Sequence, residues 1–255
     1  MVRTVSDARL ILPPAMARRG LLAAARSATA ALEGSAAAGL LCLVALVTLA
    51  GCSLPKRASG PLPAGAPQSV DGLVAAIQSD SARSDTATDG TIRAQLADEA
   101  SGYADACIAK APQAAGCLYG RGLALGLEAR AHPTSANDAL KSMLQALSGA
   151  EAADPGYDQA GPSRVRARVL LRAPGWPLGP GDPDSGLTAA RRAVELKPQY
   201  PPNLLVLAEA LSKTEDPAGA HDAYAKARDA AQAWPDVGPD RDGWVREAEQ
   251  GLQKK

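Results

Sequence analysis

From Val70 onward, apolar residues recur at spacings of three and four positions, and Pro, Gly, Asn and Asp interrupt them at intervals. This period is typical of helices that bury one face, and the interruptions mark the turns between them. The pattern predicts helices over residues 71–78, 92–110, 115–130, 136–153, 162–171, 184–196, 201–213, 217–233 and 241–250.

The composition agrees with a helical fold. Apolar residues make up 46% of the 255 residues, mostly as alanine and leucine, while aromatic residues make up 3% and phenylalanine is absent. Sandwiches and barrels are built from aromatic and β-branched residues, so this composition argues against them. We therefore predict an all-α fold.

A period of 34 residues appears in the second half of the chain. Gly186, Ala190 and Ala193 occupy three positions that recur 34 residues later as Ala220, Tyr224 and Ala227. An earlier and less regular unit ends at Pro112. The pattern resembles the tetratricopeptide repeat, in which small residues let paired helices touch closely. The resemblance implies an irregular tetratricopeptide-like α-solenoid, whose surface serves for binding.

The beginning of the chain has the features of an export signal. Arginines precede the fifteen apolar residues 36–50, a run shorter than the roughly 20 residues of a membrane span. The run ends in Leu49-Ala50-Gly51-Cys52, which resembles the lipobox of bacterial lipoproteins. This resemblance implies that residues 1–51 are a signal peptide and that Cys52 is lipidated. An uncleaved anchor and an ordinary signal peptide are the alternatives, and translation starts at either Met1 or Met16.

Residues 52–69 are rich in Pro, Gly, Ser and Ala, which predicts a flexible tether before a helical domain over 70–255. Ser53 follows the lipidated cysteine, and the sorting rule of enteric bacteria then favours the outer membrane, facing the periplasm. The inner membrane is the alternative.

The net charge excludes one class of partner. Because residues 1–51 hold five arginines and only two acidic residues, the rest of the chain carries about −3 out of a total of zero. A nucleic-acid-binding domain needs a basic face to displace counterions from phosphates, so we expect no nucleic-acid partner.

Cys107 and Cys117 flank a short predicted turn between two helices. In an antiparallel helix pair, both would lie about one turn from the bend. Disulfides persist in exported proteins, so we predict a disulfide between them, with two free buried thiols as the alternative.

Arginines crowd the predicted helix 162–171 and its end, at Arg164, Arg166, Arg168 and Arg172. Guanidinium groups suit carboxylates and phosphates, which makes this a candidate anion site, and a solvated face paired with aspartates is the alternative. Tyr157 and Trp176 bracket the helix and are candidates for ligand or partner binding.

The stretch 172–184, RAPGWPLGPGDPD, holds four prolines, which forbid a helix or a central strand. We expect a stiff connector with Trp176 packed inwards and with Asp182 or Asp184 capping the next helix. If the connector also recognises a partner, Arg172 and Trp176 are the expected contacts.

The order of motifs over residues 100–230, including CLYGRGLALGLEAR and AVELKP, resembles the TatT component family. Members of this family are lipoproteins with tetratricopeptide-like helices that are associated with TRAP transporters. The resemblance implies a non-catalytic partner of a periplasmic solute-binding protein. Self-association also remains open.

Enzymatic chemistry has little support. Hydrolysis by a nucleophile needs a base, and the chain has only His132 and His221, with no G-x-S-x-G elbow and no zinc motif. We expect no enzymatic activity, no cofactor and no metal. The alternatives to the transporter partner are a scaffold for envelope or cell-wall assembly and a small envelope hydrolase.

Overall fold

The computed structural model describes residues 62–214 and 216–253, which belong to one compact unit. The predicted signal peptide and the predicted lipidation site at Cys52 both lie outside the described residues. Within them the helices are α1 (Val70–Thr86), α2 (Gly90–Lys110), α3 (Ala115–Ala131), α4 (Ala136–Ala153), α5 (Tyr157–Arg172), α6 (Pro183–Leu196), α7 (Pro201–Lys213), α8 (Pro217–Gln232) and α9 (Pro239–Leu252).

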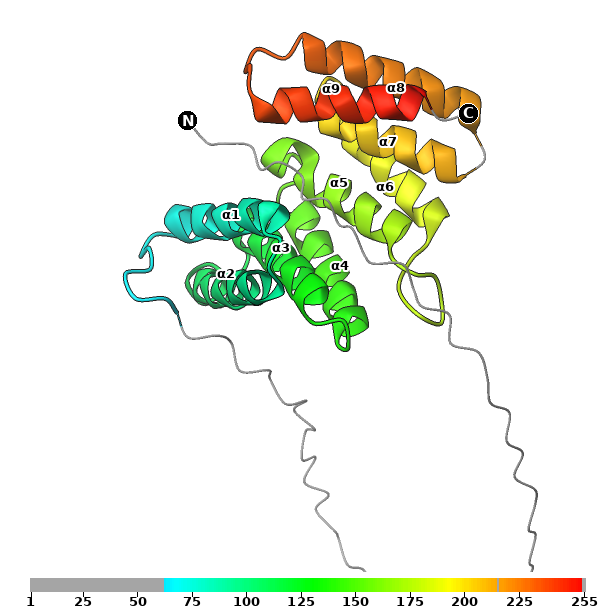
Figure 1. Cartoon of the computed structure of the whole chain (residues 1–255). Coiled ribbons are helices and arrows are strands. Elements are labelled where there is room, and N and C mark those ends of the chain that lie inside the picture. The colour runs from blue at the N-terminus through cyan, green and yellow to red at the C-terminus, as the bar shows by residue number, and fades with distance from the viewer. Residues whose placement is uncertain (1–61, 215, 254–255) are drawn as a thin grey trace, which may run out of the picture. The chain divides into compact units, whose positions relative to one another are not determined.

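The described residues form only helices and connections, and the predicted all-α fold is confirmed (Figure 1). Each helix packs against the next one in sequence, and the odd-numbered helices also contact one another in order along the chain. Contacts with near neighbours in sequence are the signature of stacked helical hairpins. The expected solenoid-like helical repeat is therefore observed.

The residues of the 34-residue period lie buried between the paired helices. Those of the second half, Gly186, Ala190, Ala193, Ala220, Tyr224 and Ala227, are all buried. A Cβ atom added at Gly186 would lie 2.8 Å from Cγ of Leu171, so α5 and α6 approach too closely there for a larger residue. The repeat thus arises from close helix contact.

The final hairpin is closed by aromatic rings. Tyr200, Trp234 and Trp244 meet edge to face, with ring centroids 5.4–5.9 Å apart. Such pairs add to the free energy gained by burying the rings. Trp244 is buried and fixes α9 against the end of the stack.

Two helices, α1 and α5, differ from their predicted bounds by more than two residues. α1 continues beyond the predicted end at residue 78 to Thr86, because the small polar side chains of Ser81 and Ser84 extend its buried face. α5 opens with three residues of left-handed backbone, Asp158, Gln159 and Ala160, before Pro162 begins the regular helix.

No described helix is both long and apolar enough to cross a membrane.

Candidate functional site

The four arginines of α5 do not share one open surface. Arg164, Arg168 and Arg172 are spaced by four residues and lie on one face of the helix, whereas Arg166 lies on another. Arg164 is fully buried and Arg168 is 4% exposed. The four-residue spacing of Arg164, Arg168 and Arg172 in the sequence already indicated a shared helix face, whereas the number of arginines alone did not.

Arg164 binds the protein's own backbone. Its Nη1 atom donates to the carbonyl oxygens of Asp158, at 3.1 Å, and Gln159, at 2.9 Å. Its Nη2 atom donates to Oδ2 of Asp158 at 3.2 Å, and the guanidinium lies 5.0 Å from the ring centroid of Tyr200. Arg164 is thus a structural residue of the left-handed turn.

Asn203 joins this turn to two further helices. It is fully buried, and its Oδ1 atom accepts from Arg164 at 3.2 Å. Its amide nitrogen lies within 3.1 Å of the carbonyl oxygens of Gln159, Ala193 and Lys197. One side chain therefore connects the start of α5, the end of α6 and the start of α7.

Tyr157, another candidate, closes the same turn on the side of α3. Its ring meets that of Tyr119 edge to face at 5.5 Å, and the Tyr119 hydroxyl donates to Oδ2 of Asp158 at 2.9 Å. Burial and, to a smaller extent, the charge of Asp158 together raise the pKa of Tyr157 to about 12. A Cβ atom on Gly161 would lie 2.8 Å from the Tyr119 hydroxyl, so only glycine fits beside it.

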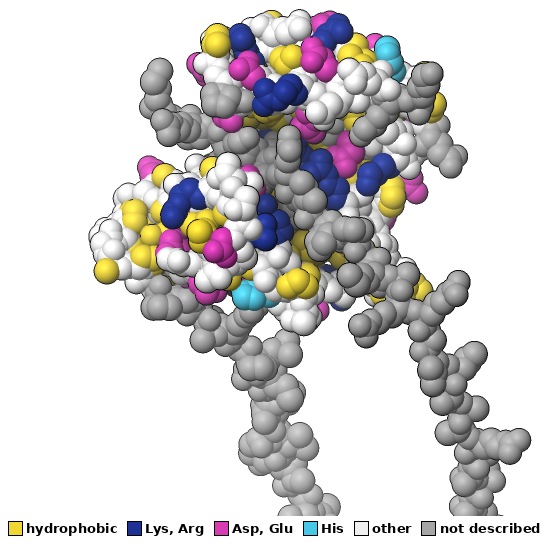
Figure 2. Space-filling model, viewed as in Figure 1, with side chains coloured by type: hydrophobic (Ala, Val, Ile, Leu, Met, Phe, Trp, Pro, Cys, Tyr) yellow, Lys and Arg dark blue, Asp and Glu magenta, His cyan; other side chains and the backbone are white. Residues whose placement is uncertain are grey.

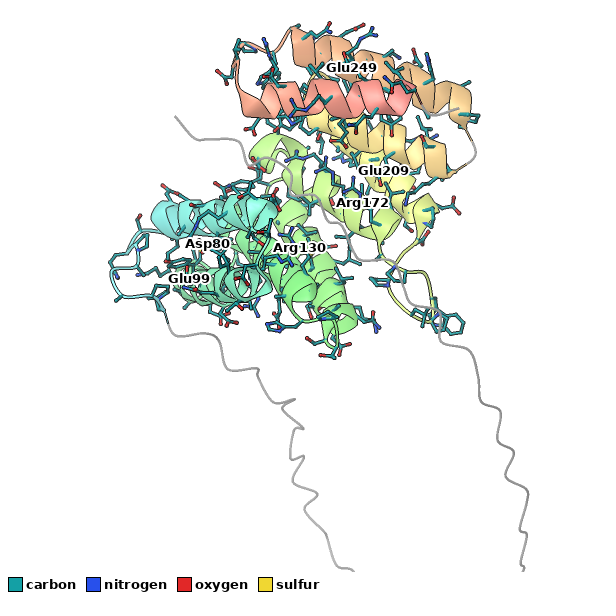
Figure 3. All side chains as sticks on the ribbon, in the orientation of Figure 1. Asp80, Glu99, Arg130, Arg172, Glu209 and Glu249 are labelled. Atoms are coloured by element: carbon teal, nitrogen blue, oxygen red, sulfur yellow. A yellow bond between two sulfur atoms is a disulfide. The ribbon has the colours of Figure 1, made fainter. Side chains whose placement is uncertain are left out.

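Arg172 forms a bidentate ion pair with Glu209 of α7 (Figure 3). Nε of Arg172 lies 2.9 Å from Oε1 of Glu209, and Nη2 lies 2.7 Å from Oε2. Burial raises the pKa of Glu209, but the hydrogen bond and charge of Arg172, with the charges of Arg168 and Lys213, lower it by more, so the pKa lies below its usual value. Arg172 is therefore engaged within the protein.

Arg166 lines an open groove between α4, α5 and α6. The groove has a volume of about 460 Å³ and also holds Glu151, Arg191, Arg192 and Glu195. Arg166 lies 3.7 Å from Glu151, and Arg192 lies 3.4 Å from Glu195. Figure 2 shows side chains of both charges interspersed over the viewed face of the described residues.

Cys107 and Cys117 are joined by a disulfide, with a Cα–Cα distance of 5.3 Å. Both cysteines are fully buried beside Leu73 and Val74 of α1. The bridge fixes the end of α2 to the start of α3.

The loop between α5 and α6 corrects the expectation for Trp176. This side chain does not pack inwards but is 90% exposed, and Leu178 beside it is 73% exposed. The loop extends beyond the ends of both helices (Figure 1). With four prolines and three glycines, the loop forms neither a helix nor a strand that could hold the Trp176 ring against the core. The other expectation is confirmed, because Asp182 caps α6 by accepting from the backbone nitrogen of Ser185.

One buried carboxylate lies away from α5. Asp80 of α1 is 4% exposed, its Oδ1 atom accepts from Arg83 at 3.0 Å, and its Oδ2 atom has no hydrogen-bond partner among the described residues. Burial and the charge of Glu99 on α2 raise the pKa of Asp80 to about 6, although Arg83 acts to lower it. Figure 3 shows Asp80 and Glu99 on these adjacent helices.

The two histidines lie apart, at the end of α3 for His132 and in α8 for His221. Within the described ranges no group of three or more His, Cys, Asp or Glu side chains is placed to hold a metal ion.

The chain matches no model of a known protein family, and no curated protein is similar enough to count as a match. The resemblance to the TatT component family therefore stays a prediction.

Proposed function

We propose that this protein is a lipid-anchored, non-catalytic binding protein of the bacterial cell envelope that holds a periplasmic solute-binding protein of a TRAP-type transporter. In this proposal Cys52 carries the lipid, residues 52–69 tether the protein to the membrane, and the stacked helices bind the partner. The motif order over residues 100–230 supports the choice of partner through its resemblance to the TatT component family.

The observation that carries a binding function is the exposure of Trp176. Tryptophan is the residue type most enriched where protein interfaces gain their binding energy. A ring that is 90% exposed gains nothing from the protein's own core. Its placement on a loop with internal hydrogen bonds supports a role in contact with another molecule.

The internal contacts of the middle helices also support a binding role. Of the candidate anion-binding arginines, Arg164 and Arg172 bind the turn of α5 and Glu209. These contacts keep the surface of the middle hairpins in one shape, which lowers the entropic cost of binding a partner.

The test is chemical crosslinking of the full-length lipoprotein in native membranes, followed by purification and mass spectrometry. We expect recovery of a solute-binding protein with transporter subunits. A Cys52→Ser variant is the matched control, because without lipid it should leave the membrane fraction. Recovery of envelope-assembly proteins alone would instead establish the scaffold function, and hydrolytic activity lost on changing His132 or His221 would contradict a non-catalytic role.

A further inference from the structure

Residues 174–178 form a continuous exposed segment of the loop between α5 and α6. Trp176 and Leu178 are two of the five exposed large hydrophobic side chains among the described residues, and they are only two positions apart. Single apolar side chains are common on protein surfaces, whereas neighbouring ones indicate a site of interaction.

The loop holds these side chains in a defined position. At its base, the backbone nitrogen of Asp182 donates to the carbonyl of Leu170 at 2.9 Å, and that of Gly181 donates to the carbonyl of Pro174 at 2.8 Å. Nearer the tip, Leu178 and Gly179 both donate to the carbonyl of Gly175. A loop ordered before binding loses less conformational entropy when a partner binds.

Gly181 makes the closed base possible. A Cβ atom at this position would collide with the backbone carbonyl oxygen of Ala173, so no other residue fits while the two sides of the loop lie this close. The side chains at the tip therefore depend on a glycine that lies outside the contact surface.

The exposed charges within the loop itself are negative, whereas at its base Lys213 of α7 donates to the carbonyl of Leu171. Asp182 and Asp184 are exposed at its base, and hydrogen bonds from the hydroxyl and backbone nitrogen of Ser185 lower the pKa of Asp182, which keeps this carboxylate ionised. The nearest arginine in sequence, Arg172, is paired with Glu209. An anionic membrane surface attracts basic segments, so this charge disfavours it and favours a cationic partner.

We propose that the loop between α5 and α6 inserts Trp176 and Leu178 into an apolar pocket of the partner protein, and that lysine or arginine side chains border this pocket opposite Asp182 and Asp184. This inference rests on the proposed function and names the surface by which the partner is recognised.

The first experiment places a photo-crosslinking amino acid at position 178 of the full-length lipoprotein in native membranes. Position 237, where Val237 is 75% exposed in another loop, is the matched control. We expect a protein adduct from position 178, attached to a partner segment that contains both apolar residues and Lys or Arg. An adduct from position 237 alone would overturn the inference and leave the proposed function standing, whereas no protein adduct from either position or by chemical crosslinking would contradict both.

The second experiment measures the affinity of the purified partner, identified by the adduct, for loop variants. Trp176→Ala should weaken binding on the order of 30-fold, as expected of a dominant contact. Leu178→Ala should weaken it several-fold, while Val237→Ala leaves it unchanged. Asp184→Asn should make the affinity less sensitive to salt concentration, because the variant lacks a negative charge whose attraction to the partner salt would screen. Equal affinity of Trp176→Ala and wild type would overturn the inference.

The third experiment tests whether the loop inserts into a membrane instead of a partner protein. The full-length lipoprotein is reconstituted in phosphatidylcholine vesicles that contain headgroup-region doxyl lipids. If the loop binds a protein partner, the doxyl lipids should not quench Trp176. The fluorescence lost to quenching should then be the same for wild type and for Trp176→Phe, once the emission of the missing tryptophan has been taken into account. Quenching confined to Trp176 would place the loop in the lipid and would contradict the inference.

Discussion

Arg172 at the end of α5 donates two hydrogen bonds to Glu209 of α7, from Nε to Oε1 at 2.9 Å and from Nη2 to Oε2 at 2.7 Å. The pair links two helices that are separated in sequence by α6. Both side chains are about four-fifths buried. A bidentate ion pair forms two charge-assisted hydrogen bonds instead of one. Because this pair is largely buried, water also screens its attraction less than that of an exposed pair.

The first prediction concerns this pair. In a double-mutant cycle with Arg172→Ala and Glu209→Ala, we expect a coupling free energy of about 1–3 kcal/mol, measured by urea unfolding. Since the pKa of Glu209 is lowered in the folded protein, the contribution of the pair is present above the unfolded pKa near 4.5 and is lost as the pH falls through the folded value. A coupling near zero at pH 7 would show that the pair adds no stability.

The second prediction compares two arginines of α5. Arg164→Ala should lower the free energy of unfolding by about 3–5 kcal/mol, because the carboxylate of Asp158 and the backbone carbonyls of Asp158 and Gln159 each lose a hydrogen bond from a buried guanidinium. Arg166→Ala is the matched control and should cost less than about 1 kcal/mol, since its side chain is 39% exposed and its Nη1 atom lies 3.7 Å from Glu151. Equal losses in chemical denaturation would contradict the structural role of Arg164.

The third prediction concerns Asp80. Because burial raises its pKa from 3.8 to about 6, the folded protein binds the proton more tightly than the unfolded chain. The resulting stability is fully present below pH 3.8 and is lost as the pH rises through about 6. Asp80→Asn should therefore raise the free energy of unfolding by about 1–3 kcal/mol at pH 7 relative to wild type, with little gain near pH 4.

Thermal unfolding across this pH range provides the measurement for Asp80. Asp98→Asn, at an exposed position of α2, is the matched control. A gain for Asp80→Asn that is the same at every pH would show that titration of this carboxylate is not its cause.

The fourth prediction concerns the disulfide between Cys107 and Cys117, which are 10 positions apart. Paired Cys107→Ser and Cys117→Ser substitutions should lower the free energy of unfolding by about 3 kcal/mol, chiefly because the unfolded chain gains freedom. The melting temperature of the double variant and of the reduced protein measures the effect. A thiol reagent that modifies both positions in the unfolded, unreduced protein would show instead that the cysteines are free.

Much of the fold is determined by local sequence. The bounds predicted for α4 and α7 are those observed, since each helix is bordered by residues that cannot continue it, such as Pro201 at the start of α7. Asp182 was recognisable as a cap from its place before Pro183. The proximity of Cys107 and Cys117 followed from a short turn between antiparallel helices.

Tertiary structure alone decided the environment of the charged and aromatic side chains. Arg164 and Arg166 are two positions apart, yet one is sealed beneath α7 and the other lines an open groove, because burial depends on which face of α5 meets α7. The polar side chain of Asp80 gave no sign of burial, which comes from the packing of α1 against α2. Trp176 was expected to pack inwards, and the loop instead leaves its side chain 90% exposed. A local pattern determines where helices begin and end, whereas the contact between helices, which involves residues far apart in the chain, determines which side chains are left to bind a partner.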